Sequence, residues 1–280
     1  MTPEYSETYF LSAGETNPEQ ELSLPLLTAK IIDIATAHAN SLGIGNPAMA
    51  DIHAGWVLSR LTIEMTSYPR VNDTYTITTW IESWNRRFSE RAFMITCNGQ
   101  IMGYARSIWM VMDIESRHNV GLAHLSLQPD MISARPCPIA RQIRHCQIVP
   151  MDTTQLPAGA IRATVPATPY TFKYCDLDSY RHVNTVRYVT MLLNQFTLAD
   201  FDATFADRLE LSFLHETRYG MSVRLLRADT TALHTDTTDP NTDITNLNTD
   251  TTTFLSSFSL IRADTAEALL FARLRRRPRS

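Results

Sequence analysis

Residues 21–43 read ELSLPLLTAKIIDIATAHANSLG and predict one long, largely buried helix that ends near Gly43. The apolar residues share one helical face, at offsets of four, seven, eight and fifteen from the first of them: Leu27, Ile31, Ile34, Ala35 and Leu42. Four stretches rich in β-branched and aromatic residues follow, at 56–65, 73–84, 91–99 and 100–113. The first half is therefore predicted to be a helix followed by a meander of long antiparallel strands.

The same pattern restarts in the second half of the chain. A strand is expected at 168–174 and a helix from Val183 to Phe196, whose apolar residues again share one face. Four further strands are expected after this helix, at 208–217, 221–228, 254–263 and 267–276. Because helices and strands do not alternate as in βαβ units, we predict an α+β protein.

A proline-rich stretch separates the two halves. Seven of the fourteen prolines of the chain fall between Pro129 and Pro169. Proline lacks a backbone donor, so a sheet interior is not expected here. We therefore predict an N-terminal unit at 1–128, a linker across the surface at 129–167 and a C-terminal unit at 168–280.

Composition limits the classes of protein that this chain can belong to. Its 280 residues are 44% hydrophobic, which is enough apolar material for about two globular domains. It has neither a run of about 18 apolar residues nor a signal-like N-terminus, so we expect a cytoplasmic protein without membrane association. The four scattered cysteines indicate reduced thiols, and the net charge of −4 does not favour nucleic acid as a partner.

A helix wrapped by a strongly bent antiparallel sheet, present twice, resembles the double hotdog fold. The stretch from Trp56 to Ile95 and ARSIWMVMD at 105–113 resemble the fatty acyl-ACP thioesterases of plants and bacteria. That family shows W-V-x-x-R, Y-P-x-x-x-D, T-W and S-x-W motifs in this order. In the second half, DLDSYRHVN at 176–184 resembles the family pattern D-x-D-x-N-x-H-V-N-N-x-x-Y, with Tyr188 in the final position and Thr185 departing from the N-N pair.

The resemblance implies a tandem hotdog, with two long helices each wrapped by a sheet, that hydrolyses fatty acyl thioesters of acyl carrier protein in fatty acid biosynthesis. No cofactor or metal is implied. The family's catalytic Asp, His and Glu fall on Asp178, His182 and Glu216. Its Asn falls on Tyr180, a substitution that leaves either a variant site or a lost activity.

The chemistry of these residues can also be weighed without the family. A thioester carbonyl needs a base for the attacking water and donors for the oxyanion. A histidine side chain can exchange a proton near neutral pH, and His182 precedes a helix whose N-terminal N–H groups can face negative charge. No G-x-S-x-G elbow is present and Cys175 has no evident base partner, so water attack is preferred. Whether Glu216 or His182 is the base stays open, and Asp178 also suits a turn or helix cap.

Other residues are candidates for substrate and carrier contacts. Large apolar side chains of the first half are candidate walls of an acyl pocket, although such residues are usually ordinary core: Trp56, Trp80 and Trp109. Asn184 matches the family, as a substrate contact or as a cap. Arg86 and Arg87, at a predicted turn, are candidates for contact with the acidic carrier, as is the basic run ARLRRRPRS at 272–280.

Three functions are left open by the sequence: an acyl-ACP thioesterase, an acyl-CoA thioesterase, and a non-catalytic acyl-carrier-binding protein.

The Thr/Asp-rich segment at 229–253 is predicted to be a mobile hairpin extension. Asp239, Asn241 and Asp243 give only the alternation of a calcium loop, without its glycine. Two hotdogs in one chain already form an internal pair, and a further homodimer is left open.

Overall fold

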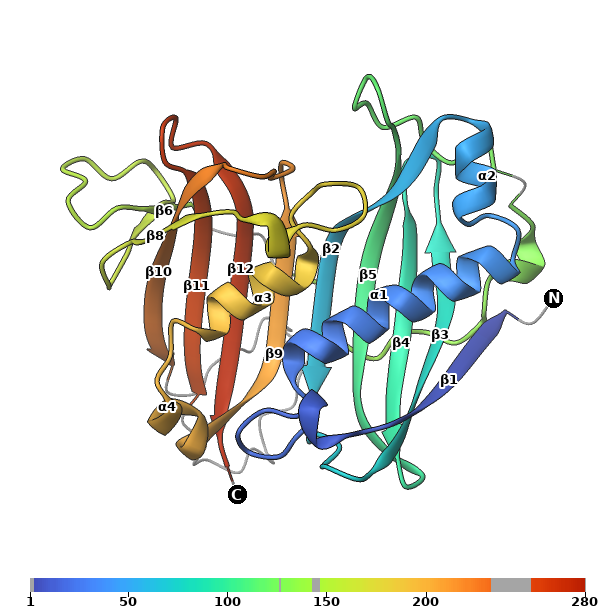
Figure 1. Ribbon diagram of the computed structural model, residues 1–280, viewed down its shortest axis with the longest axis horizontal. Helices are drawn as coiled ribbons and strands as arrows, with labels where there is room; N and C mark the ends of the chain where they lie inside the picture. Colours follow the sequence, from blue (N-terminus) through green and yellow to red (C-terminus); the bar gives the residue numbers. More distant parts are fainter. Residues whose placement is uncertain (1–2, 126, 143–146, 233–252, 280) are drawn as a thin grey trace, which may run out of the picture.

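One ten-stranded antiparallel sheet forms the body of the protein (Figure 1). The computed structural model describes residues 3–125, 127–142, 147–232 and 253–279. The strands follow one another across the sheet in the order β1 (Glu4–Phe10), β3 (Thr74–Trp84), β4 (Ser89–Cys97), β5 (Gln100–Asp113), β2 (Ala54–Met65), β9 (Thr204–Phe213), β12 (Ala268–Pro278), β11 (Thr253–Arg262), β10 (Ser222–Ala232) and β8 (Thr168–Thr171).

The two halves of the sheet repeat the same order from edge to centre. In each half the first strand forms the edge, and the strand that follows the helix lies at the centre. The central strands β2 and β9 pair with each other, with Leu61 opposite Leu211. The predicted tandem hotdog architecture is therefore confirmed, and the pairing fuses both halves into one sheet.

Helix α1 (Leu24–Ser41) lies within the predicted range 21–43 and ends just before Gly43, as expected. The hydroxyl of Ser23 accepts a hydrogen bond from the Leu26 N–H, and Pro25 occupies the first turn. Gly43 follows the helix with φ +73°, a conformation that favours glycine. The predicted apolar residues are buried against the sheet, including Leu27, Ile31 and Ile34.

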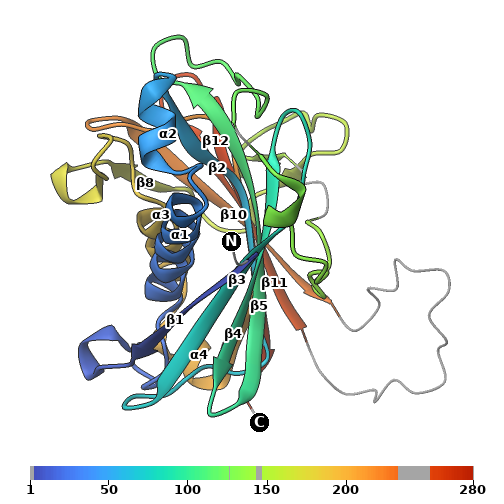
Figure 2. The ribbon, with the colours of Figure 1, turned by 90° about the vertical axis from the view of Figure 1, so that its right-hand side faces the viewer.

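The second helix is shorter than the sequence pattern suggested. Helix α3 spans only Thr185–Leu193, because Asn184 caps its start and the chain turns before Phe196. A separate short helix, α4 (Leu198–Ala203), begins at a capping box formed by Thr197 and Asp200. The prediction of two long helices was wrong in this respect. Helices α1 and α3 lie side by side on one face of the sheet (Figure 2), and α2 (Asn46–Asp51) follows α1.

The segment between the halves packs on the face of the sheet opposite α1 and α3 (Figure 2). It contains a small parallel pair of strands, β6 (Ile148–Val149) and β7 (Ile161–Arg162). Gln142 lies at the seam of the two halves, where its Nε2 donates to the carbonyl oxygens of Leu61 at 2.8 Å and Leu211 at 2.9 Å. The linker therefore fastens β2 to β9.

Replacing Gln142 with alanine is expected to lower the free energy of unfolding by about 1–2 kcal/mol, because two hydrogen bonds across the seam are lost. Urea unfolding of the variant and the wild type measures this difference. An unchanged midpoint would mean that the seam does not depend on the linker.

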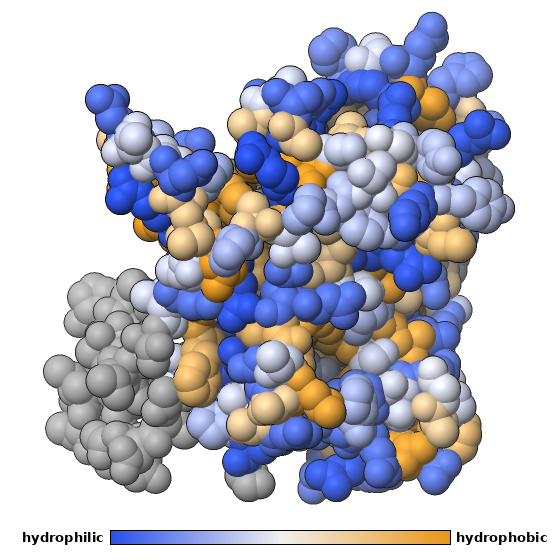
Figure 3. All heavy atoms as spheres, turned by 60° about the vertical axis from the view of Figure 1, so that its left-hand side comes forward, coloured by the Kyte–Doolittle hydropathy of each residue, from blue (hydrophilic) through white to orange (hydrophobic). Residues whose placement is uncertain are grey.

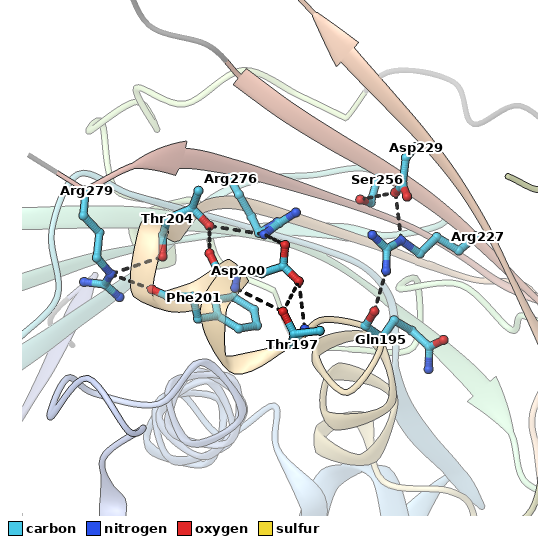
Figure 4. A network of polar contacts seen from close by, with 10 residues as sticks. All are labelled: Gln195, Thr197, Asp200, Phe201, Thr204, Arg227, Asp229, Ser256, Arg276 and Arg279. Carbon is cyan, nitrogen blue, oxygen red and sulfur yellow. Dashed lines mark hydrogen bonds and ion pairs between the residues drawn. The ribbon is translucent and has the colours of Figure 1, made fainter. Parts of the chain in front are cut away.

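The basic run at 272–280 belongs to the fold. Arg276 packs on the Phe196 ring at 4.2 Å. Its Nη1 lies 3.5 Å from Oδ1 of Asp200 (Figure 4). Arg279 donates to both carboxylate oxygens of Glu21, at 2.7 and 2.9 Å. These contacts tie β12 to α4 and to the first half. They also indicate a structural role for these two arginines, and contact of the run with a carrier stays a prediction.

The side of the C-terminal half that Figure 3 turns forward mixes polar and apolar side chains. None of the described helices has the length and apolar character needed to cross a bilayer. Most of the predicted extension at 229–253 lies outside the described residues, because residues 233–252 are not described. Its candidate calcium ligands, Asp239, Asn241 and Asp243, all fall in this gap.

Candidate active site

A cavity of about 570 Å³ opens between the two halves of the protein. Its lining divides by chemistry. The first half supplies mostly apolar side chains from α1, β2, β3 and β5, including Ile32, Ala35, Ala39, Leu58, Ile81 and Met110. The second half supplies the polar and ionisable side chains Asp178, Tyr180, His182 and Glu216. The cavity therefore joins an apolar chamber to the predicted catalytic residues.

His182 and Glu216 form a pair at this cavity. The Nε2 atom of His182 lies 3.2 Å from Oε2 of Glu216, and both side chains are partly exposed. The Val183 N–H donates to the Thr217 carbonyl oxygen at 3.0 Å, which holds the two loops together. Glu216 was expected on a strand, but β9 ends at Phe213 and Glu216 lies in the loop that follows.

Asp178 closes the loop that carries the histidine. Its Oδ1 accepts the backbone N–H groups of Tyr180 at 2.9 Å and His182 at 3.0 Å. The Asp178 N–H in turn donates to the His182 carbonyl oxygen at 2.8 Å. Asp178 therefore bonds to the backbone N–H of His182 and stabilises a turn. This agrees with the turn alternative that the sequence left open for Asp178.

The first half contains the same turn, which the sequence analysis missed. Asn17 Oδ1 accepts the Glu21 N–H at 2.8 Å, and the Asn17 N–H donates to the Glu21 carbonyl oxygen at 2.8 Å. Gln20 and Arg181 occupy the corresponding positions with φ of 62° and 63°. An asparagine thus builds in one half the turn that Asp178 builds in the other.

Two of the predicted residues lie beside the pair without bonding to it. Tyr180 lines the cavity but is 64% exposed, and no hydrogen bond of its hydroxyl to a described residue is found. Asn184 is the N-cap of α3, accepting the Val186 N–H at 3.0 Å, and is not part of the cavity lining among the described residues. The capping alternative for Asn184 agrees with this geometry.

The three tryptophans expected as pocket walls separate into two groups. Trp56 and Trp109 line the cavity, with their indole N–H groups donating to Ile44 O and Ser107 Oγ, both at 2.7 Å. Trp80 faces the linker and donates to the Arg135 carbonyl oxygen at 2.6 Å. Successive strand residues point to opposite faces, so the cavity wall on β3 is the next residue, Ile81.

Two buried polar groups border the cavity. Burial lowers the pKa of Arg91 to about 9, and its Nη1 lies 2.6 Å from Nδ1 of His38. Burial also raises the pKa of Tyr188 to about 12, against the opposing hydrogen bond with Thr217. Tyr188 therefore stays a neutral phenol near neutral pH, and it packs beside Phe213.

The two arginines predicted for carrier contact are not among the described residues that line the cavity. Arg86 and Arg87 are exposed in the turn between β3 and β4, where the Leu122 N–H donates to the Arg86 carbonyl oxygen at 3.0 Å. Arg117 and Arg218, which sequence reasoning missed, contact Glu216 at 2.9 and 3.4 Å. No local pattern signals Arg117, because it lies 99 residues from its partner.

The described residues contain no group of three or more His, Cys, Asp or Glu side chains placed to hold a metal ion. The cavity lining contains the His182–Glu216 pair, Asp178 and the first residue of α3, Thr185.

Comparisons with solved structures agree with this fold. An acyl-ACP thioesterase from Bacteroides thetaiotaomicron superposes with a TM-score of 0.76 over 98% of each chain, at 21% identity. A 12:0-ACP thioesterase from Umbellularia californica superposes with a TM-score of 0.72, covering 99% of this chain and 94% of its own, at 17% identity. At such low identity these matches speak for the fold.

Sequence comparisons extend over most of the chain. The chloroplastic acyl-acyl-carrier-protein hydrolase FATB3 of Cuphea viscosissima is 23% identical over 222 residues, 76% of this chain and 52% of its own length. The chain spans about half the length of the first curated relatives that it matches. Family models for the acyl-ACP thioesterase N-terminal and C-terminal domains match residues 3–124 and 162–258. The chain therefore belongs to the acyl-ACP thioesterase family.

Proposed function

We propose that this protein hydrolyses fatty acyl thioesters of acyl carrier protein to a free fatty acid and the carrier thiol. The observation that carries the proposal is the cavity of about 570 Å³, whose apolar walls lead to His182 and Glu216. An apolar chamber suits an acyl chain, and the polar pair suits the thioester carbonyl. The names of the relatives support the same reaction.

Water attacks the thioester carbonyl in the proposed mechanism. The Glu216–His182 pair takes a proton from that water as the new C–O bond forms. The tetrahedral intermediate then breaks its C–S bond, and the leaving thiolate receives a proton from the pair. Because the two side chains are 3.2 Å apart, a proton can pass between them and they act as a unit.

The start of α3 is the proposed oxyanion site. Val183 and Thr185 line the cavity next to His182, and the first N–H groups of a helix have no partners within the helix itself. The side chain of Asn184 accepts the Val186 N–H, and the Asn184 backbone carbonyl oxygen accepts the Arg187 N–H at 2.9 Å. The Thr185 N–H and the positive end of the helix dipole favour negative charge that develops on the carbonyl oxygen of the substrate.

Acyl carrier protein is the proposed source of the acyl group. Arg86 and Arg87 are exposed at a turn of the N-terminal half and can steer an acidic carrier toward the protein. A comparison of acyl-ACP with acyl-CoA of the same chain length, following free thiol, tests this choice. We expect the higher kcat/KM with acyl-ACP. A higher kcat/KM with acyl-CoA would contradict the carrier assignment while leaving the hydrolysis in place.

Enlarging Ala35 to phenylalanine is expected to shift the substrate preference toward shorter acyl chains. Ala35 lies on α1 with its side chain at the cavity wall, so the added ring occupies space proposed for the acyl chain. We expect kcat/KM for long chains to fall about tenfold or more, since each methylene excluded from the cavity loses about 0.8 kcal/mol. Short acyl-ACPs serve as the internal control. An unchanged chain-length profile would show that the acyl chain does not reach Ala35.

A further inference from the structure

The two carboxylate oxygens of Glu216 have different partners. Oε2 lies 3.2 Å from His182 Nε2, whereas Oε1 accepts a hydrogen bond of 2.9 Å from Arg117 Nη1. Arg218 contacts Oε2 at 3.4 Å. A charge-assisted hydrogen bond to one oxygen fixes the direction of the other. The Arg117 contact therefore bears directly on the pair that carries the proposed chemistry.

Arg117 belongs to the N-terminal half and is held by a tight turn after β5. Its backbone N–H donates to the Asp113 carbonyl oxygen at 3.1 Å, and its φ is +60°. The Asp113 side chain accepts the Ser116 N–H at 2.6 Å, which closes the turn from the other side. The guanidinium thus reaches the cavity from a defined backbone position, and it is part of the cavity lining.

The other half of the protein uses a comparable ion pair in the opposite direction. Arg279 follows β12, the strand that corresponds to β5, and it binds Glu21 in the first half through two hydrogen bonds. Glu21 occupies the position in its turn that His182 occupies in the second turn. Each half therefore extends an arginine to the other half, and of these two arginines Arg117 is the one that contacts the proposed catalytic pair.

We propose that Arg117 is a positioning residue for the hydrolysis, an inference that rests on the proposed function. By holding Oε1 of Glu216, it directs Oε2 toward His182 and keeps the pair aligned with the thioester. Without Arg117, the remaining cation on Glu216 is Arg218, which shares the oxygen that faces His182. The N-terminal half then contributes to turnover as well as to the acyl chamber.

Kinetics of Arg117→Met and Arg117→Lys with acyl-ACP test this role. We expect Arg117→Met to lower kcat about 10–100-fold with little change in KM, because a small displacement of a catalytic group is costly. Arg117→Lys should recover part of the loss. Added guanidinium should restore turnover to Arg117→Ala, an effect that a merely structural role would not produce.

Arg135→Met is the matched control, since Arg135 and Glu4 form a pair of similar exposure on the opposite face of the sheet. We expect its kcat to stay within about twofold of the wild type. A wild type that hydrolyses acyl-ACP together with an Arg117→Met variant of unchanged kcat would overturn this inference alone. A wild type without hydrolysis would overturn the proposed function and this inference together.

Discussion

Replacing His182 with alanine is expected to lower kcat for acyl-ACP about 10²–10⁴-fold, the range that a general base contributes. Glu216→Gln should have an effect of similar size, because each change disables the same 3.2 Å pair. The double variant is expected to be scarcely slower than either single variant, since groups that act as a unit are not additive. Steady-state release of carrier thiol is measured for the wild type, the two single variants and the double variant, which together form a double-mutant cycle.

Additive losses would contradict this account of the pair. If the double variant lost the product of the two single effects, His182 and Glu216 would act in separate steps. Thermal unfolding of each variant checks that the fold is intact. His124→Ala serves as the control, because His124 is exposed and is not part of the described cavity lining. Its kcat should stay within about twofold of the wild type.

Replacing Asp178 with alanine is expected to lower kcat about 10–100-fold, because the loop that carries His182 loses its two side-chain hydrogen bonds. Asp178→Asn should keep kcat within about tenfold of the wild type, since an amide oxygen still accepts both N–H groups. The first half supports this expectation, because Asn17 builds the same turn there. Kinetics of both variants on acyl-ACP give the comparison.

The asparagine variant decides what Asp178 does. A folded Asp178→Asn variant as inactive as His182→Ala would show that the negative charge itself takes part in the chemistry. The geometry favours a positioning role, because Oδ1 of Asp178 is bonded to backbone N–H groups. Melting temperatures of the two Asp178 variants separate loss of the turn from loss of the charge.

Periodicity in the sequence was sufficient to predict the main elements of the fold. The apolar face of α1 follows from apolar residues that recur every three to four positions. The long strands β2 to β5 follow from stretches rich in β-branched and aromatic residues. The repeat of this pattern predicted the tandem arrangement. The length of α3 was overestimated because the apolar face continues to Phe196, while Asn194 and Thr197 already end one helix and begin the next.

The site was predicted in part, since its residues come from separate segments. The family resemblance predicted Asp178, His182 and Glu216 as site residues, and the structure places all three at one cavity. The contacts that each of these side chains makes could not be predicted from the sequence, because the turn around Asp178 depends on backbone geometry. Arg117 gave no signal, since a single arginine in a turn acquires its partner only when the two halves join through β2 and β9.

Trp80 shows a further limit of reasoning from residue type. A large apolar residue on a strand can face either side of a sheet, and the sequence did not reveal that the linker covers the second side. The alternation along β3 places Ile81 at the cavity and Trp80 against the linker. Because both faces of this part of the sheet are buried, residue type alone does not show which large apolar side chains on a strand line the pocket.

The release of products from acyl-ACP is the direct test of hydrolysis at the His182–Glu216 pair. Free fatty acid and free carrier thiol are measured in parallel for the wild type and for the His182→Ala/Glu216→Gln double variant, together with binding of acyl-ACP to each. We expect equimolar acid and thiol from the wild type, and release slowed about 10²–10⁴-fold in the double variant, which still binds. A folded wild type that binds acyl-ACP and releases neither product would contradict the proposed hydrolysis.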